Sequence, residues 1–152
     1  MDEAKRLDDI ANNSMYNLGV SKICAQYCGQ VFMRYMGCGS VLELGPAEGM
    51  MTDILYPHYS DDYTVVDSGS IFVEQIKKRY PNIKGFTSLF ENFAPQQKYK
   101  NIILGHVLEH VIDPVGILKL CRGWLDDGGV ILAAVPNANS IHRQAAVEMA
   151  AD

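Results

Sequence analysis

Long hydrophobic runs are missing from this sequence. No apolar stretch approaches the roughly 20 residues that a membrane-spanning helix needs. The first nine residues, MDEAKRLDD, also lack the apolar region of a signal peptide. Repeats, linkers and low-complexity tracts are absent as well. We therefore expect a cytoplasmic protein that makes no use of a membrane.

A surplus of positive charge is missing too. The chain has 13 Lys and Arg against 18 Asp and Glu, which gives a formal net charge of −5 and a pI near 5.3. Nucleic-acid-binding surfaces are typically basic. We therefore expect no nucleic-acid partner, and a small-molecule substrate fits this charge balance better.

Cysteine is scarce and widely spaced. The four cysteines, Cys24, Cys28, Cys38 and Cys121, form no close pair of the kind that binds a structural metal. In a reducing compartment they are most simply small core residues. Cys24 and Cys28 lie one helical turn apart, and nothing further follows from their spacing.

What the sequence does contain is an ordinary globular composition with a regular alternation of patterns. Its 152 residues are 48% hydrophobic and 20% charged, which suits one domain with one core. Short apolar runs alternate with helical patterns, and this alternation predicts a parallel sheet covered by helices on both faces. The expected strands are each short and nearly all apolar, as buried parallel strands should be, and span 40–44, 63–67, 83–87, 101–104 and 129–135.

Three helices are expected between these strands, at 49–56, 70–80 and 114–124. Asp113 should cap the last helix, with Pro114 at its first position. A turn over 126–129 should lead into the fifth strand. Residues 2–36 predict one or two further helices with a break near 18–20.

The first strand ends in a glycine turn. Residues 40–50 read SVLELGPAEGM, so Glu43 is followed by Gly45 and Gly49. Because glycine has no Cβ, these positions let backbone N–H groups approach a nucleotide-like ligand. Glu43 stands where it could meet a positively charged ligand group. A dinucleotide fingerprint would need a third glycine at Met50, and a P-loop would need a Gly-Lys-Ser/Thr ending. The alternative is a buried strand with a plain glycine turn.

A second carboxylate ends the second strand. Asp67 follows the glycine turn by about twenty residues, where doubly wound folds place an acid that binds ribose hydroxyls. Adenosine is therefore the expected core of the ligand. Asp67 could instead cap the following helix through residues 68–70, and the two roles are compatible.

Together these motifs resemble a known family. Glu-x-Gly-x-x-x-Gly is similar to the first motif of the class I S-adenosylmethionine-dependent methyltransferases. SLFENFAP at 88–95 resembles their adenine loop, and LEHVIDP at 108–114 resembles the branch with ubiquinone-type and sugar O-methyltransferases. The segment 124–137, WLDDGGVILAAVPN, is similar to their fifth strand. Four motifs in this order identify the chain as a member of the class I family.

The resemblance implies an α/β fold, a Rossmann-like doubly wound and mostly parallel sheet, with S-adenosyl-L-methionine as cofactor and S-adenosyl-L-homocysteine as product. Ala47 departs from the family's usual glycine and should slightly tighten the turn. Leu89 and Phe90, implied at the adenine, could equally be core packing. The cofactor-binding residues that the resemblance implies are Glu43, Gly45, Ala47, Gly49, Asp67, Ser68, Leu89, Phe90 and His106.

Two histidines are candidates for a general base. Methyl transfer from a sulfonium needs alignment, and a base only where the acceptor carries a proton. His110 matches a base in several relatives, and His106 ends the fourth strand, so we rank them equally as catalytic residues. His110 could instead orient the following helix. His106, Glu109 and His110 could also converge on a divalent metal. No fourth ligand is evident, so our first expectation is a site without a metal.

Candidates for acceptor contacts are polar residues near both ends of the chain. Arg143 would suit a phosphate or carboxylate, although a solvated helix start explains it equally well. Tyr16 lies in the predicted amino-terminal helix, where aromatics more often pack. The substrate-binding candidates are Tyr16, Asn137, His142 and Arg143, with Asn139 beside them.

The domain division that follows is a helical lid at 1–39 and a cofactor-binding core at 40–152. The family's sheet usually ends in an antiparallel hairpin of two further strands, which we do not find before Asp152. An uncovered fifth strand would be an open edge. We therefore expect either a longer natural protein or a second chain, such as a homodimer partner, on this edge.

The function predicted from these observations is O-methylation of a small metabolite, sugar or natural product. Methylation of nitrogen or carbon stays open. The rival from another class is a non-catalytic cofactor-binding module, or pseudoenzyme, that needs a partner chain. A nicotinamide-dependent oxidoreductase is remote, because the third glycine is absent.

Overall fold

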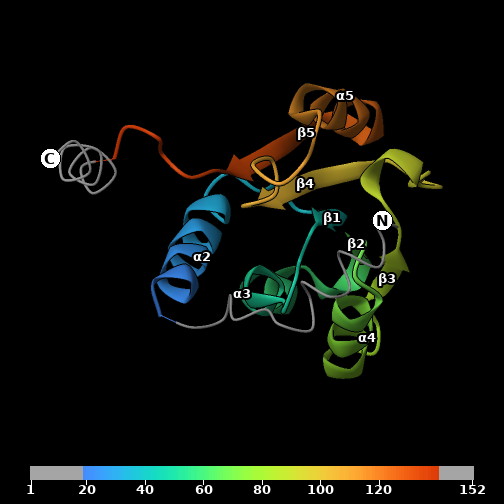
Figure 1. Cartoon of the computed structure of the whole chain (residues 1–152). Helices are drawn as coiled ribbons and strands as arrows, with labels where there is room; N and C mark the ends of the chain where they lie inside the picture. Colours follow the sequence, from blue (N-terminus) through green and yellow to red (C-terminus); the bar gives the residue numbers. More distant parts are fainter. Residues whose placement is uncertain (1–18, 141–152) are drawn as a thin grey trace, which may run out of the picture.

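The computed structural model describes residues 19–140 and shows one five-stranded parallel sheet (Figure 1). Its order is β3-β2-β1-β4-β5, and every neighbouring pair is parallel. The chain winds outward from β1 to β3, then returns to place β4 on the other side of β1. The strands are β1 Val41–Leu44, β2 Tyr63–Asp67, β3 Lys84–Thr87, β4 Tyr99–Gly105 and β5 Leu125–Ala134. The predicted Rossmann-like α/β fold is confirmed.

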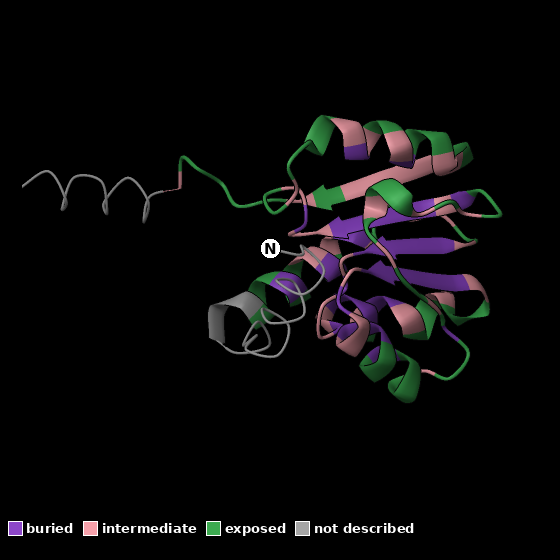
Figure 2. Ribbon diagram, turned by 45° about the vertical axis from the view of Figure 1, so that its right-hand side comes forward, coloured by how far each residue is buried: buried purple, intermediate pink, exposed green. Residues whose placement is uncertain are grey.

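Helices cover both faces of this sheet. Alternate strand residues point to opposite faces, so β1 sends Val41 into one apolar cluster and Leu42 into the other. The first cluster also contains side chains of α2, α3 and α4, and the second contains side chains of α5. Figure 2 shows the buried central strands between these layers. The helices are α2 Gly19–Phe32, α3 Met50–Tyr59, α4 Ser70–Arg79 and α5 Pro114–Trp124, with 3-10 turns η1 Ser60–Asp62 and η2 Phe90–Asn92.

Part of the predicted lid belongs to the core. Helix α2 lies within residues 1–39, yet it packs against α3 and buries Ala25 and Phe32. Gly29 permits this approach, because a Cβ there would lie 3.0 Å from Cδ1 of Ile54. The described part of the segment therefore contributes to the apolar layer.

The third strand is exposed, contrary to the prediction of buried strands throughout. β3 is an outer strand of the sheet, and only Gly85 among its four residues is half-buried. Phe86 keeps 46% of its surface exposed. The central strands β1 and β2 are buried at every position, as predicted.

The ends of α3 and β5 differ most from prediction. α3 continues past Tyr56 through Pro57 to Tyr59, because the aromatic residues of its last turn pack on the core. β5 begins at Leu125, so the turn expected at 126–129 is an irregularity within the strand. There the pairing shifts from Tyr99 with Leu125 to the next described pair, Asn101 with Val130.

The start of α5 agrees with the sequence. Its bounds are as predicted, and the Asp113 carboxylate accepts a hydrogen bond from the Gly116 N–H at 2.9 Å. None of the described helices has the length and apolarity needed to cross a membrane.

Candidate functional site

The candidate site lies where the strand order reverses. β1 and β4 are neighbours in the sheet but lead to loops on opposite sides of it, so a crevice is expected at their carboxyl ends. The loop after β1 carries the glycine turn, and the loop after β4 begins with His106. Two motifs far apart in the sequence thus meet at one end of the sheet.

The glycine turn has a left-handed backbone at three of its five residues. Gly45, Ala47 and Gly49 have φ values of 63°, 48° and 83°. A Cβ at Gly45 would lie 2.8 Å from Cγ2 of Val107, so only glycine fits there. Gly49 caps the start of α3. These three positions give the turn a backbone conformation that glycine takes most readily, and a turn of small residues suits close approach of a ligand to the backbone.

Ala47 has the same handedness without the freedom of glycine. A left-handed conformation costs an L-residue about 1 to 2 kcal/mol. The Ala47 N–H donates to Oδ2 of Asp67 at 3.2 Å, and this hydrogen bond helps to hold the conformation. The turn is therefore maintained by contacts from outside it.

Asp67 is buried at the end of β2, with 8% of its surface exposed. Its Oδ1 accepts from the Gly69 N–H at 2.8 Å, and Gly69 is the cap residue of α4. The alternative of a role at the helix start is thus supported, and the contact with Ala47 adds a link to the turn. Burial raises the pKa of this carboxyl, against the lowering effect of the backbone N–H groups. The ribose contact stays a prediction.

Glu43 is buried and is held by residues of α3 and β2, and its contact with a ligand stays a prediction. Its side chain is enclosed beneath the turn, with 2% of the residue exposed. Thr52 Oγ1 and Tyr63 Oη both donate to its Oε2 at 2.8 Å. Burial raises the pKa of Glu43 to about 7, although both hydrogen bonds lower it. The carboxylate points toward α3 because Leu42 and Leu44 take the other face of the sheet.

The loop after β3 supplies the two residues predicted at the adenine. Phe90 is half-buried in η2 and packs against the cluster that contains Val107. Its ring lies 3.6 Å from the position that a Cβ of Gly45 would take. Leu89 is 37% exposed, and Ser68 is half-buried after β2. Phe90 therefore has the packing role weighed as the alternative, and it also lies beside the turn.

His106 has three unusual features at the end of β4. Its φ is 59°, one of two positive values among the described non-glycine residues. Its Nδ1 lies 3.4 Å from Oε1 of Glu109. Its Nε2 is buried and has no hydrogen-bond partner among residues 19–140. The backbone N–H donates to the Ala134 carbonyl at 2.9 Å, which ties the residue to β5.

His110 is placed differently. The residue is exposed in the turn after His106, and its N–H donates to the Val107 carbonyl at 2.9 Å. Among the described residues, no group of three His, Cys, Asp or Glu side chains is arranged to hold a metal ion. The arrangement of the described residues therefore gives no support to the alternative of a metal at His106, Glu109 and His110.

The acceptor candidates are only partly within the described chain. Tyr16, His142 and Arg143 lie outside residues 19–140. Asn137 is exposed after β5, and its Oδ1 accepts from the Asn139 N–H at 3.0 Å. This side chain therefore shapes a local turn.

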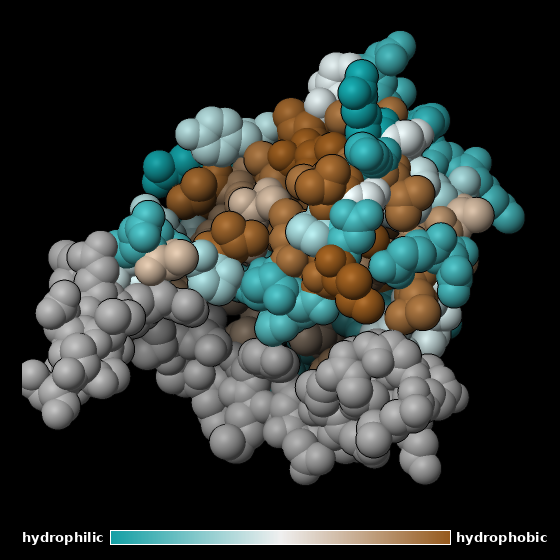
Figure 3. All heavy atoms as spheres, turned by 45° about the horizontal axis from the view of Figure 1, so that its top comes forward, coloured by the Kyte–Doolittle hydropathy of each residue, from teal (hydrophilic) through white to brown (hydrophobic). Residues whose placement is uncertain are grey.

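Large exposed apolar residues lie near the carboxyl ends of the strands. These residues are Leu89, Ile112, Val115 and Val135. Figure 3 shows apolar atoms gathered on the side of α5 and β5.

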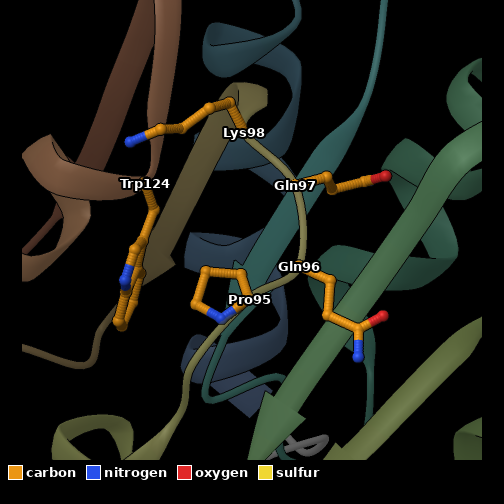
Figure 4. A pocket seen from close by; sticks show the side chains of 5 residues that line it. All are labelled: Pro95, Gln96, Gln97, Lys98 and Trp124. Carbon is orange, nitrogen blue, oxygen red and sulfur yellow. The ribbon is translucent and has the colours of Figure 1, made fainter.

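A hollow of about 190 Å³ lies at the opposite end of the sheet (Figure 4). The residues that line it, Pro95, Gln96, Gln97, Lys98 and Trp124, precede β4 and β5. Two of its polar side chains are engaged, since Lys98 Nζ donates to the Gly123 carbonyl and Gln97 Nε2 donates to the Asp62 carboxylate. This hollow is separate from the glycine turn.

Sequence reasoning missed three residues that support the turn from behind. Thr52 and Tyr63 hold Glu43, and Arg79 of α4 donates through Nη2 to the Glu48 carbonyl at 3.1 Å. Arg79 lies 31 residues from Glu48, and no periodic pattern connects such positions.

Comparisons with known proteins agree with this architecture. Residues 20–152 match the sequence profile of the family described as "Methyltransferase domain". Trans-aconitate 2-methyltransferase of Rhodopseudomonas palustris (strain HaA2) is 27% identical over 100 residues, which make up 65% of this chain and 39% of that protein. The chain thus matches well under half of the length of this curated relative.

Two solved structures share the fold at low identity. The DhpI-SAM-HEP complex superposes with a TM-score of 0.70 at 19% identity, over 84% of this chain and 61% of that one. The N-methyltransferase NodS from Bradyrhizobium japonicum WM9, in complex with S-adenosyl-L-homocysteine, gives a TM-score of 0.69 at 20% identity, over 84% and 68%.

Proposed function

The chain belongs to the methyltransferase domain family, and from this premise we propose that it binds S-adenosylmethionine at the carboxyl ends of β1 and β2 and methylates a small molecule. The observation that carries the proposal is the left-handed glycine turn tied to the buried Asp67 carboxylate. Solved neighbours of this fold hold S-adenosylmethionine or its demethylated product, as their names state.

The residues present fit this cofactor. Gly45 allows the backbone of the turn to lie close to Val107, because a Cβ there would come within 2.8 Å of Cγ2 of Val107, and the Phe90 ring lies beside the same position. The Asp67 carboxylate, at 8% exposure, keeps a small accessible surface for a ribose hydroxyl. We assign Gly45, Ala47 and Gly49 to the methionine part of the cofactor. Ser68 and Asp67 contact the ribose, and Leu89 and Phe90 flank the adenine.

Glu43 has an indirect role in this proposal. Its carboxyl is enclosed by Thr52 and Tyr63, so it supports the turn from beneath and places a titratable group behind the methionine site. A cation bound above the turn would favour the ionised form of this carboxyl.

For the chemical step we choose His106 over His110. When bound, the cofactor would supply an electrophilic methyl group, which an acceptor atom attacks in line so that the neutral thioether leaves. His106 is the better base for an acceptor hydroxyl, because its buried Nε2 has no hydrogen-bond partner in the described part of the chain and Glu109 lies 3.4 Å from its Nδ1. That carboxylate would stabilise the imidazolium after proton transfer. His110 is exposed and orients the loop.

The acceptor is a small molecule with a hydroxyl or carboxylate oxygen, in keeping with the LEHVxDP segment and its O-methyltransferase branch. The proposed acceptor contacts are Tyr16, Asn137, His142 and Arg143, of which the structure describes Asn137. A carboxylate acceptor, of the kind named for the curated relative, would pair with Arg143 and need no base.

The outer edge of β5 is the proposed site of self-association. In the part of the chain that the structure describes, β5 pairs only with β4. An apolar strand with one unpaired edge favours pairing with a second strand. A homodimer through β5 predicts twice the chain mass by light scattering. A monomer over the micromolar range would contradict it.

The proposal is tested by titrating the purified protein with S-adenosylmethionine, S-adenosylhomocysteine and NAD in separate calorimetric experiments. Micromolar binding of the first two and none of NAD is the expected result. Transfer of a labelled methyl group is then measured with hydroxyl, carboxylate and amine acceptors. Binding without transfer to any acceptor would favour the non-catalytic module, and binding of none of the three ligands would refute the cofactor site.

A further inference from the structure

One arginine from the end of α4 reaches two points, one in the glycine turn and one in α3. Arg79 is the last residue of α4. Its Nη2 donates to the Glu48 carbonyl at 3.1 Å, and its Nη1 pairs with Oδ1 of Asp53. A single guanidinium therefore connects the turn and the first part of α3.

The Glu48 carbonyl and the Asp53 carboxylate lie on either side of the start of α3. The Glu48 carbonyl belongs to the peptide that leads into Gly49, which has a φ of 83° and caps the helix. The Asp53 N–H donates to the Gly49 carbonyl at 2.8 Å, so Asp53 lies in the first turn of α3. The Tyr80 hydroxyl also donates to Oδ1 of Asp53, at 3.0 Å.

The contact behind the turn is close. A Cβ at Gly49 would lie 3.2 Å from Arg79 Nη1 and 3.1 Å from Cγ1 of Ile76. The last part of α4 thus packs directly on the left-handed peptide. Since Ala47 two residues earlier also has a left-handed backbone, the turn depends on such external support.

Arginine is the residue type that this arrangement requires. Its planar fork can donate to two acceptors at fixed angles, whereas the single ammonium of lysine would reach one of them at a time. Both side chains of the pair are partly exposed, 38% for Arg79 and 46% for Asp53. Water screens such a pair, so its main effect is on geometry.

We propose that Arg79 is a positioning residue of the cofactor site. It holds the peptide between Glu48 and Gly49 in the conformation that receives the ligand, and it contacts neither the cofactor nor the reacting atoms. Arg79 therefore sets the affinity for the cofactor and leaves the chemical step unchanged. This inference rests on the proposed function of the glycine turn.

The test compares Arg79→Met, which keeps the length of the side chain, with Arg79→Lys and the control Lys78→Met. Lys78 is the exposed neighbour of Arg79. We expect Arg79→Met to raise the Kd for S-adenosylhomocysteine about tenfold, the effect of losing one hydrogen bond to a charged group. Arg79→Lys should restore part of the affinity, and Lys78→Met should match the wild type. At saturating cofactor, kcat should change by less than about twofold.

Hydrogen exchange in the ligand-free protein separates this inference from the proposed function. The amides of Gly49 and Asp53 should exchange about tenfold faster in Arg79→Met, while amides of β4 stay protected. Faster exchange with no cofactor binding by the wild type would refute the proposed function and support the positioning of the turn. Unchanged exchange and Kd in folded Arg79→Met would overturn the inference. If Arg79→Met does not fold, the same criteria apply to Arg79→Lys.

Discussion

The Asp67 carboxylate accepts a hydrogen bond from the backbone N–H of Ala47 at 3.2 Å, across the ends of two neighbouring parallel strands. Its other oxygen accepts from Gly69 at 2.8 Å. One buried side chain thus ties the loop after β1 to the loop after β2. Any ligand bound at Asp67 is therefore sensitive to the shape of the glycine turn.

Replacement of Asp67 should weaken cofactor binding. We expect Asp67→Ala to cost about 1 to 3 kcal/mol of binding free energy, because a charged hydrogen bond to the ribose and the support of Ala47 are both lost. Calorimetric titration with S-adenosylhomocysteine measures the change. The exposed Asp61 offers a control, and Asp61→Ala should bind as the wild type does. Equal affinity in Asp67→Ala would remove the ribose assignment.

The two histidines should separate in turnover. His106→Asn keeps a residue that tolerates a left-handed backbone, so its fold should survive. We expect its kcat to fall about a hundredfold or more with an acceptor hydroxyl, since the base is lost. His110→Asn should stay within a few-fold of the wild type. Steady-state kinetics at saturating cofactor decides between them, and a large loss only in His110→Asn would transfer the role to that residue.

Glu43 should make stability depend on pH. Its pKa rises from 4.5 to about 7 in the folded protein, so the neutral carboxyl stabilises the fold below pH 4.5. This contribution is lost as the pH rises through 7, up to about 3 kcal/mol in all. In urea unfolding, the wild type should therefore lose stability relative to Glu43→Gln between pH 5 and pH 8. The raised pKa of Asp67 is common to both proteins and cancels. A constant difference at both pH values would show that Glu43 does not titrate in this range.

Glycine at position 47 should stabilise the fold. Ala47 has a φ of 48°, and glycine takes this conformation without steric cost. Glycine also has more conformational entropy in the unfolded chain, and this offsets part of the gain. We therefore expect Ala47→Gly to raise the free energy of unfolding by about 0.5 to 1 kcal/mol. Ala133→Gly in β5 is the matched control and should lower it by about the same amount. Lower stability in Ala47→Gly, measured by urea unfolding, would mean that the turn imposes no strain on alanine.

Local patterns in the sequence predict much of the fold. β2 and α5 have the predicted bounds, because an apolar run and a cap with Pro114 are signals within a few residues. The exposure of β3 was missed, since an apolar strand does not reveal its place at the edge of a sheet. The early start of β5 was missed because its pairing at Leu125 depends on Tyr99.

The candidate site, like the fold, could be predicted from the sequence only in part. The glycine turn and Asp67 follow strand ends, where sequence spacing alone locates them. The side of the sheet that Glu43 faces could not be predicted, because alternation separates it from Leu42 and Leu44 without saying which layer receives each set. The left-handed backbone of His106 could not be predicted from the sequence, because no local pattern indicates it.

The sequence by itself determined the alternation of strands and helices, the family, and the loops that meet at one end of the sheet, because these depend on neighbouring residues and short spacings. Only the tertiary structure decided which side chains hold those loops in place. Thr52 and Tyr63 enclose Glu43, and Arg79 binds the Glu48 carbonyl from another helix. Such contacts arise when elements pack across the sheet, and the packed distance between two side chains is not encoded in their separation along the chain.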